Sequence, residues 1–396
     1  MDSTHKGKGL SRNTKILGMV SFLNDASSEM LEPIIPLFLM NVLGASALVI
    51  GLLEGVSEIV VALLRMLSGW LSDKYRSRRK LMLFGYSLST ATKAFFPFAA
   101  TWPQFFAAKT VERMGKGVRT PARDALIGES EPGGQLGKAF GFRKMMDSAG
   151  AILGPLLAAF FLVFFSGMGE EWAYRTIFMI AVLPAALGVG MLFFIREKKG
   201  ELGKIKDKAG MFNGELRAFI LVAALFSIAQ MGTAFFILRA GELLPLVMVP
   251  VSYLAYNIVY TTMSLPMGVL TDRLGARGMM ALAYAFFAMA VLVFGFLGGP
   301  LAAFLGFALL GFFIAIAETS PRVYLVKAVP GHRYASAIGA YQGLTGMMFL
   351  PANIVAGVLW EVQVAGAHAP FVFSAAVAAL AMALMLFYVK EAGGRR

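Results

Sequence analysis

Two short segments of this chain repeat one another almost half a chain apart. Residues 69–74 (GWLSDK) and residues 268–273 (GVLTDR) both fit the pattern G-x-L-x-D-[KR], in a sequence of 396 residues. Each segment follows a long apolar run and begins a cluster of positive charge. A repeat at this spacing predicts two copies of one membrane unit, the architecture in which secondary transporters form a central site.

The repeat continues beyond these two turns. Residues 120–123 (TPAR) resemble residues 320–322 (SPR), and residues 139–141 (AFG) resemble residues 337–339 (AIG). Three matches at nearly the same offset indicate a duplicated scaffold. We therefore expect an all-α integral membrane protein with twelve transmembrane helices in two pseudo-symmetric bundles of six.

The composition also predicts a membrane protein. Apolar residues make up 58% of the chain, charged residues make up 15%, and the mean hydropathy is +0.70. Soluble domains have about 45–50% apolar and about 25% charged residues. The chain has no cysteine, and its three histidines fall in predicted tails or loops. We therefore expect no metal site and no cofactor.

One long polar stretch, rich in Lys and Gly, separates the two halves. It predicts an N-terminal bundle over residues 1–195, a cytoplasmic linker over residues 196–214 and a C-terminal bundle over residues 215–396. Positive charge gathers on the side of this linker, and the opposite loops contain almost no Lys or Arg. This pattern predicts a multi-pass protein of the plasma (inner) membrane with both termini in the cytoplasm.

The net charge of +13 follows this membrane pattern and does not indicate nucleic acid, because no aromatic-basic platform accompanies it. A membrane-embedded enzyme is disfavoured as well. The sequence has no H-E-x-x-H or G-x-S-x-G motif and no histidine in a predicted span. The expected partners are a small-molecule solute, protons and the lipid bilayer, and we expect a monomer.

Residues around the repeated turns fit a longer pattern, G-x-x-x-D-[RK]-x-G-[RK]-[RK]. The first copy matches at Gly69, Asp73, Lys74, Arg78 and Arg79, with Arg76 where glycine is usual. The second copy matches at Gly268, Asp272, Arg273, Gly275 and Arg277. These turns resemble the loop 2–3 signature of the major facilitator superfamily, and the resemblance covers the whole chain. It implies the twelve-helix fold and carrier-type transport.

The resemblance implies that Asp73 and Asp272 act as gate latches. Glycine lets two helices approach each other, and the aspartate can cap a neighbouring helix or pair with nearby cations. The alternative is a topology signal that only anchors positive charge on one side of the membrane. Duplication of the turn favours the latch.

Residues 112–119 (ERMGKGVR) resemble the family's R-x-x-Q-G pattern, with Lys116 in the glutamine position. In family antiporters this arginine is associated with proton coupling, which implies that role for Arg113. A position about 17 Å into the span, near mid-bilayer, makes an uncompensated charge costly. Arg113 therefore faces a cavity or, alternatively, forms a structural ion pair.

Residues 150–159 (GAILGPLLAA) resemble the family's antiporter motif, with alanines in place of its last two glycines. Gly150 and Gly154 permit close helix packing, and Pro155 bends the span. The resemblance favours antiport over symport and predicts a seal against proton leak.

Carboxylates gather on the first two predicted spans. Asp25, Glu29 and Glu32 share one helical face, and Glu54 and Glu58 are one turn apart on the next span. In a poorly solvated cavity such acids repel one another, so at least one is expected to hold a proton near neutral pH. The alternative is that they only neutralise the basic residues of the first half, which are Arg65, Lys93, Arg113, Lys116 and Arg143.

The two halves differ in their polar residues. Arg143 and Asp147 form a further i, i+4 pair in the first half, where ionisable residues concentrate. The second half offers amide and aromatic groups, so we expect it to contact substrate. The candidate substrate-binding residues are Glu54, Lys116, Gln230, Tyr256, Asn257, Tyr341 and Gln342. A tyrosine stripe can alternatively serve only helix packing or interface anchoring.

The function predicted from these patterns is proton-coupled efflux of a small organic solute by alternating access. The candidate coupling residues are Asp25, Glu29, Glu58, Arg113, Arg143 and Asp147. The alternative is a symporter or uniporter of an anionic or metal-chelate solute, held by Arg113, Lys116 and Arg143.

Overall fold

The computed structural model describes residues 9–75, 78–131, 136–196, 214–329, 334–364 and 367–391. The protein is all-α, as predicted, apart from one short β-hairpin. Most of the predicted linker, residues 197–213, lies outside the described residues. The elements are α1 (Arg12–Leu31), α2 (Ile35–Asn41), α3 (Ala47–Tyr75), α4 (Arg78–Phe95), η1 (Phe96–Phe98), α5 (Trp102–Ser130), α6 (Leu136–Phe164), η2 (Ser166–Met168), α7 (Glu170–Leu192), α8 (Gly214–Ala229), α9 (Thr233–Leu243), α10 (Met248–Leu274), α11 (Ala276–Phe296), α12 (Pro300–Ala317), α13 (Ser320–Ala328), α14 (Tyr334–Leu359), β1 (Gln363–Val364), β2 (Ala367–His368) and α15 (Ala369–Phe387).

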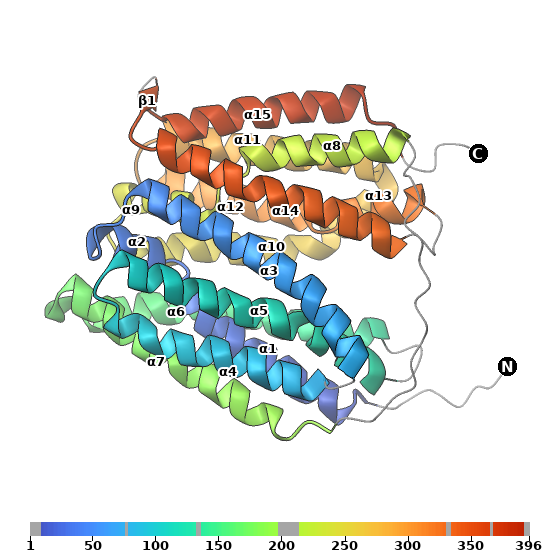
Figure 1. The fold of residues 1–396 in the computed structure, drawn as a ribbon. Helices are drawn as coiled ribbons and strands as arrows, with labels where there is room; N and C mark the ends of the chain where they lie inside the picture. The colour runs from blue at the N-terminus through green and yellow to red at the C-terminus, as the bar shows by residue number, and fades with distance from the viewer. Residues whose placement is uncertain are drawn as a thin grey trace. The chain divides into compact units, whose positions relative to one another are not determined.

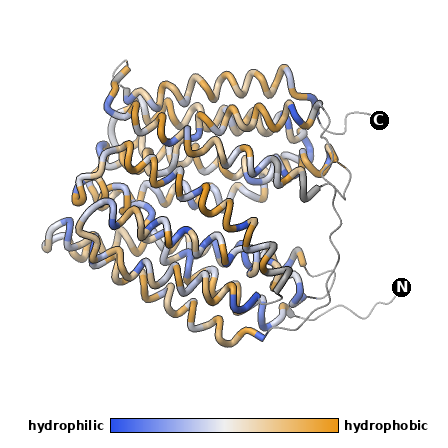
Figure 2. The backbone as a smooth tube through the Cα atoms, viewed as in Figure 1, coloured by the Kyte–Doolittle hydropathy of each residue, from blue (hydrophilic) through white to orange (hydrophobic). Residues whose placement is uncertain are grey.

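Eight segments of the described chain are long and apolar enough to cross a membrane. They include α3, α6, α7, α11, α14 and α15, together with the joined pairs α8–α9 and α12–α13. Figure 2 shows hydrophobic residues along most of the length of these helices. Helices α1, α4, α5 and α10 are 18 to 29 residues long but more polar. Twelve spans require these four as well, so that count stays a prediction.

The chain forms two compact units that differ from the predicted halves, chiefly in residues 32–59. The first unit contains residues 1–31, 60–161 and 165–203, and the second contains residues 32–59, 162–164 and 204–396. Residues 32–59, which carry α2 and the start of α3, therefore pack with the second unit. The predicted division at residues 195 and 215 remains a proposal about which helices move together.

Glycines set the closest helix contacts in the first unit. A Cβ atom at Gly85 on α4 would lie 2.7 Å from the carbonyl oxygen of Gly115 on α5, and Gly115 in turn meets the backbone of Gly85. Helices α1 and α7 also pack on one another, as do α4 and α7. Such close crossings are typical of membrane helix interfaces, where small residues let backbones approach.

Helix α1 begins with a cap from Ser11, which Glu131 at the end of α5 holds in place. The Ser11 hydroxyl accepts a hydrogen bond from the Thr14 amide, and the Ser11 amide donates to Glu131 at 2.9 Å. Burial raises the pKa of Glu131, but hydrogen bonds from Thr14 and Ser11 outweigh it and hold that pKa below its ordinary value. The contact therefore stabilises the fold above the ordinary glutamate pKa and loses that contribution as the pH falls.

In the second unit, α8, α11, α14 and α15 lie side by side, and α10 packs on α12 (Figure 1). Aromatic rings fill its interior, and Phe226 stacks on Tyr284 with ring centroids 3.9 Å apart. The first half of α3 packs on α14, because Gly51 meets the backbone of Asn353 and Gly55 meets Leu350.

Two spans of the second unit are interrupted, which the sequence patterns did not predict. The break between α8 and α9 lies at Gln230–Gly232, near the middle of the candidate span Leu216–Leu243. The break between α12 and α13 lies at Glu318–Thr319. Pro321 follows it and lacks the amide that would continue the helix. Pro121, its counterpart in the repeat, lies inside the continuous helix α5.

Candidate functional site

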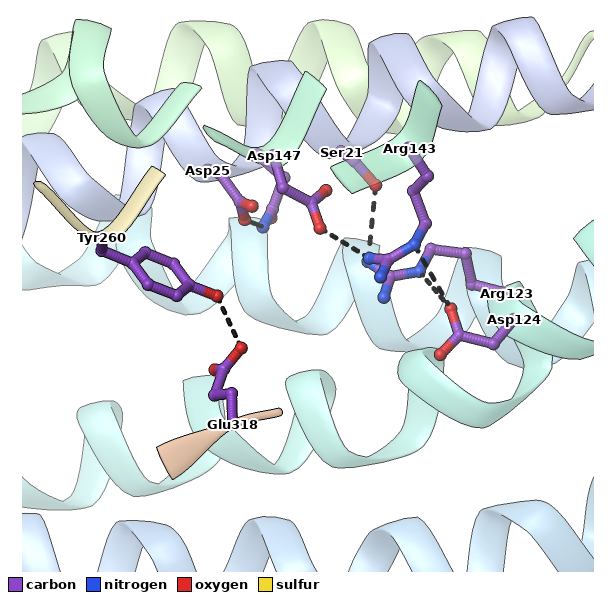
Figure 3. A network of polar contacts seen from close by, with 9 residues as sticks. Ser21, Asp25, Arg123, Asp124, Arg143, Asp147, Tyr260 and Glu318 are labelled. Carbon is purple, nitrogen blue, oxygen red and sulfur yellow. Dashed lines mark hydrogen bonds and ion pairs between the residues drawn. The ribbon is translucent and has the colours of Figure 1, made fainter. Parts of the chain in front are cut away.

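A charged cluster forms in the first unit where three helices meet (Figure 3). Helix α1 supplies Ser21 and Asp25, α5 supplies Arg123 and Asp124, and α6 supplies Arg143 and Asp147. Two of the predicted coupling residues, Arg143 and Asp147, are one helical turn apart on α6, as the sequence spacing requires.

The two arginines and two of the aspartates form a chain of contacts. Arg143 Nη1 lies 2.6 Å from Asp147 Oδ2, and Arg143 Nε lies 3.9 Å from Asp124 Oδ1. Arg123 Nε lies 3.0 Å from the same Asp124 oxygen and donates a second hydrogen bond to the Ser21 hydroxyl at 3.4 Å. Arg143 is therefore shared between two carboxylates, one on its own helix and one on α5.

Asp147 is more enclosed than Asp124. Its side chain is 15% exposed, whereas Asp124 is 39% exposed. Among the described residues, Asp147 Oδ1 is buried and accepts no hydrogen bond. The charges that act on Asp147 are those of Asp25, Arg123, Arg143 and Lys144. A proton on Asp147 would neutralise the carboxylate and release Arg143 to Asp124.

The predicted packing motif on α6 lies directly against the carboxylate helix α1. A Cβ atom at Gly150 would lie 2.5 Å from the Phe22 carbonyl oxygen and 3.1 Å from the Asp25 Cβ. A Cβ atom at Gly154 would lie 2.7 Å from the Glu29 Cβ and 2.6 Å from the Met30 amide nitrogen. The glycines therefore place Asp25 and Glu29 against the helix that carries Asp147.

A second charged cluster, between α1, α4 and α5, was not predicted as a site. Lys93 is 1% exposed and donates hydrogen bonds to the Ser27 and Ser28 hydroxyls at 2.9 and 2.8 Å. Glu112 is 3% exposed and forms an ion pair of 3.2 Å with Lys109. The signal in the sequence was the presence of charged residues inside long apolar runs, which usually marks a functional or tightly paired group.

Arg119 completes this second cluster. It is 4% exposed, donates a hydrogen bond to the Ser89 hydroxyl at 2.9 Å, and lies over the Tyr86 ring at 4.4 Å. Ser89 in turn donates to the backbone carbonyl of Glu112. These contacts hold α4 and α5 together, and they neutralise or enclose charges that no lipid can solvate.

Of the other predicted coupling residues, Arg113 lies beside the second cluster and Glu58 lies in the other unit. Arg113 and Lys116 are half-buried on α5, and the charge of Arg113 acts on Glu112. Glu58 is half-buried on the part of α3 that packs with the second unit. The structure therefore brings Asp25, Arg143 and Asp147 together within one unit and assigns Glu58 to the other.

In the second unit, two predicted substrate-binding residues lie at the break between α8 and α9. Gln230 is part of the break itself. A Cβ atom at Gly232 would lie 3.1 Å from Glu54 Oε2 and 2.8 Å from Asn353 Oδ1. The fully buried Asn353 side chain accepts a hydrogen bond from the Gly232 amide at 2.8 Å. Asn353 therefore supplies the hydrogen-bond acceptor that the Gly232 amide would otherwise find within a continuous helix.

The tyrosine stripe on α10 forms a ladder of rings. Tyr253 and Tyr256 stack with centroids 5.5 Å apart, and Tyr256 and Tyr260 stack at 6.3 Å. The Tyr260 hydroxyl donates a hydrogen bond of 2.6 Å to Glu318 Oε2 (Figure 3). Asn257, on the same helix, is 3% exposed.

The last two predicted substrate residues lie on α14 and differ in environment. Tyr341 is half-buried and stacks on Phe219 with centroids 5.9 Å apart. Gln342 is exposed. Among the described residues, no three His, Cys, Asp or Glu side chains lie close enough to bind a metal ion together.

Sequence comparison matches residues 17–251 and 246–396 to the Major Facilitator Superfamily. The chain belongs to this superfamily. The predicted family resemblance is therefore confirmed, and the protein is a multi-pass membrane transporter of small-molecule solutes. An uncharacterized MFS-type transporter of Methanocaldococcus jannaschii is 34% identical over 388 residues, which cover 96% of this chain and 95% of the relative.

More distant superfamily members carry functional names. The multidrug resistance protein MdtG of Klebsiella pneumoniae is 26% identical over 318 residues, with 73% of each chain covered. Among solved structures, a variant of the nucleoside transporter NupG superposes with a TM-score of 0.78 at 15% identity, covering 95% of this chain and all of the other. An auto-inhibited peptide transporter of the POT family gives a TM-score of 0.76. At such identity these structures show the fold alone.

Arginines that follow the two repeated turns make similar contacts. Arg79 donates a hydrogen bond to the Phe193 carbonyl at 2.8 Å, and Arg277 donates to the Val389 carbonyl at 3.1 Å. In each copy, an arginine that follows the turn thus binds an open carbonyl at the end of the last helix of that half. This agreement supports the duplicated scaffold predicted from sequence.

The individual residues of the two repeated turns have different environments. Arg78 forms an ion pair of 2.7 Å with Glu129, and a Cβ atom at Gly69 would lie 3.9 Å from the Pro121 Cβ. Gly268 has open space around it, and Asp272 and Arg273 are exposed. The side chains of Asp73 and Lys74 lie outside the described residues. The latch role of the aspartates therefore stays a prediction.

In the second copy, the backbone conformation and the neighbouring Glu391 explain why the turn contains glycine at position 275. Gly275 has φ +90°, and a Cβ atom there would lie 2.7 Å from Glu391. The Glu391 carboxylate accepts hydrogen bonds from the Ala276 and Arg277 amides at 2.9 and 3.0 Å. A carboxylate thus caps the start of α11, where the helix dipole favours negative charge.

Replacing Glu391 by glutamine is expected to lower the stability of the protein by about 1 kcal/mol, because the negative charge at the N-terminus of α11 is lost. Thermal unfolding of the purified protein would detect this as a lower midpoint. Glu361→Gln, the same chemical change at an exposed residue after α14, is the control. Equal midpoints for Glu391→Gln and wild type would contradict the capping role.

Proposed function

We propose that this transporter is a proton-coupled exporter of a small organic solute that works by alternating access. Protons and solute move in opposite directions, and the two six-helix bundles, residues 1–195 and 215–396, rock about a central site. The proposal also takes the protein to be a monomer in the plasma membrane, with residues 196–214 and both termini on the cytoplasmic side.

The observation that carries the proposal is Arg143 shared between Asp147 and Asp124. When Asp147 is charged, Arg143 is held at 2.6 Å on its own helix. When Asp147 binds a proton, its attraction for Arg143 falls, and the arginine turns to Asp124 on α5. One proton therefore decides whether Arg143 pairs within α6 or ties α6 to α5, which is the kind of coupling that an antiporter needs.

The contact of α6 with α1 supports the same function. Gly150 and Gly154 hold the backbone of α1 against the helix of Asp147, and Asp25 is one of the charges that act on Asp147. Movement of Arg143 is thus transmitted to the helix that carries Asp25 and Glu29. The multidrug name of the MdtG relative is consistent with export.

The alternative, an anionic or metal-chelate solute held by Arg113, Lys116 and Arg143, has less support. Arg143 is already paired with Asp147, so its charge is compensated within the protein. A substrate anion would have to displace that carboxylate, at the expense of leaving an acid unpaired in the membrane.

The test begins with the purified protein and a panel of solutes. Thermal shifts at pH 5.5 and pH 8 identify a ligand whose stabilisation depends on pH. That ligand is then given to proteoliposomes that contain a pH-sensitive dye. We expect solute movement in one direction to drive protons in the other. Co-directional movement would support the symporter, and solute movement without proton flux would contradict coupling.

A further inference from the structure

A histidine lies at the end of the short β-hairpin that connects α14 to α15. His368 immediately precedes α15, at the end of that helix that is opposite the C-terminus (Figure 1). Its side chain is 14% exposed, so it exchanges protons with the solution at this end of the second unit. In the proposed topology, with the C-terminus in the cytoplasm, that solution is the one outside the cell.

Both ring nitrogens of His368 face oxygen atoms that can only accept hydrogen bonds. Nδ1 lies 2.8 Å from the Trp360 carbonyl oxygen, and Nε2 lies 3.0 Å from Oε2 of the Glu242 carboxylate. A neutral imidazole has one N–H group and one lone pair, so either tautomer turns its lone pair towards one of these oxygens. Only the imidazolium donates to both. The arrangement therefore fits the protonated ring.

The Glu242 carboxylate is shared between two cationic groups. Arg239 Nη1 lies 2.7 Å from the same oxygen, Oε2, and both residues are on α9. Arg239 Nε also donates to the Phe294 carbonyl at 2.9 Å, which fixes the arginine on α9. Loss of the proton from His368 therefore leaves the ion pair within α9 intact and removes only the attraction between α9 and the hairpin.

The Trp360 ring favours the same protonation state. It is 3% exposed and stacks on the His368 ring, with centroids 4.5 Å apart and planes 13° apart. A cation over the face of a tryptophan is attracted by the negative charge of the ring face. Trp360 also contacts Phe235 on α9, with centroids 5.5 Å apart. His368 thus lies where the hairpin packs against α9.

Few other charges act on this contact. Helices α14 and α15 contain no charged residue, and the only one in α11 is Arg277, in the first turn of that helix. Glu361, the residue after Trp360, is exposed. The charged groups that face the His368 ring are therefore Glu242 and Arg239 from α9.

Helix α9 is also the part of the second unit that is least tied to its own span. It follows the break at residues 230–232, so its hydrogen bonding does not continue into α8. It packs on α2, where a Cβ atom at Gly241 would lie 2.7 Å from Leu37 Cδ2. Residues 32–34 join α2 to α1. The position of α9 therefore affects the segment that continues directly into the carboxylate helix.

We propose that His368 and Glu242 form a proton-operated clamp that holds α9 to the outer hairpin. At low outer pH the imidazolium donates to Glu242, and the clamp is closed. As the outer pH rises, the ring loses its proton, Nε2 becomes a second acceptor opposite Glu242, and the clamp opens. The contact therefore stabilises α9 at low pH and is lost as the pH rises. This inference goes beyond the proposed export and rests on it only for the side of the membrane.

The test measures hydrogen exchange of the full-length protein in lipid nanodiscs at pH 5.5 and pH 8, without solute or gradient. Exchange times are scaled for the effect of pH on free amides, and peptides from α11 serve as the reference. The reporting amides are Leu244, which donates to Ala240 at the end of α9, and Ala369, which donates to Val362 across the hairpin. We expect their scaled exchange to be about threefold to tenfold slower at pH 5.5 than at pH 8.

Variants assign the effect to the clamp. His368→Gln cannot titrate, so the scaled rates at the two pH values should become equal. Glu242→Gln removes the carboxylate that the imidazolium binds and should also abolish the difference. His332→Gln is the matched control, because His332 belongs to a loop that is predicted to be cytoplasmic and lies outside the described residues. It should keep the pH dependence of wild type.

Two results would overturn the proposal. One is equal scaled exchange of the α9 and hairpin amides at both pH values in the wild-type protein. The other is a His368→Gln variant, or a Glu242→Gln variant, that is folded by thermal unfolding and keeps the wild-type difference. Because neither solute nor gradient is used, a failure of the clamp leaves the coupling at Asp147 untouched. A transporter without proton coupling would likewise leave the clamp intact.

Discussion

Asp147→Asn is expected to abolish proton-driven transport while the protein still binds its solute. Asparagine has nearly the same shape as aspartate, but it neither carries a charge nor binds a proton near neutral pH. Arg143 then loses its partner at 2.6 Å and turns to Asp124 permanently. The variant should resemble the protonated transporter at every pH.

The measurement compares two activities in proteoliposomes. Uphill transport driven by a pH gradient is expected to fall at least about a hundredfold, because the coupling site no longer titrates. Exchange of labelled for unlabelled solute, which needs no net proton movement, should remain within a few-fold of wild type and lose its pH dependence. This combination separates a coupling defect from misfolding.

The control is Glu170→Gln, an exposed acid in the first turn of α7. It should leave both activities unchanged. If Asp147→Asn kept full gradient-driven transport, the proton would have to bind elsewhere. Asp25 and Glu29 on α1, already candidates from the sequence, would then be tested in the same assay.

Gly154→Ala is expected to destabilise the protein and impair transport, although it adds a single methyl group. The new Cβ would lie 2.6 to 2.7 Å from backbone atoms of Glu29 and Met30, closer than van der Waals contact allows. Backbone cannot rotate away as a flexible side chain can, so α1 and α6 must separate. Overpacking of this kind costs about 1–3 kcal/mol.

A matched glycine-to-alanine variant is expected to change stability in the opposite direction. Gly128 lies within helix α5 with no other atom within 4 Å of the added Cβ position. Gly128→Ala should therefore raise stability by about 0.5–1 kcal/mol through helix propensity alone. Thermal unfolding compares the two, and the pH-sensitive dye tests whether Gly154→Ala leaks protons. If the Gly154→Ala variant unfolded at the same temperature as wild type and leaked no more protons, close packing would not be the role of the motif.

Local patterns predicted more of the scaffold than of the site. These patterns are local in sequence: the apolar runs, the repeated turns and the G-x-x-x-G-P motif. They can therefore be recognised without knowing what each helix packs against. Arg143 and Asp147 were recognisable for the same reason, since an i, i+4 pair meets on any helix.

The partners of those residues were not recognisable. Asp124 lies next to Arg123 in the sequence, yet its role as the second partner of Arg143 depends on how α5 crosses α6. Lys93 and Ser27 are 66 positions apart and meet only because α1 and α4 share an interior. The helix breaks at residues 230–232 and 318–319 also escaped prediction, because both lie inside long apolar runs that were predicted as continuous spans.

The sequence by itself determined that this chain is a membrane protein, that it is built from a duplicated helical unit and that it belongs to a transporter superfamily. These properties follow from composition, periodicity and short motifs, which are local. The tertiary structure decided which acids share an arginine, which glycines bring two backbones into contact, and where a carboxylate meets a row of tyrosines. Those contacts join distant segments, and the energy of an ion pair or a close crossing depends on distances of a few ångströms that no spacing in the sequence specifies.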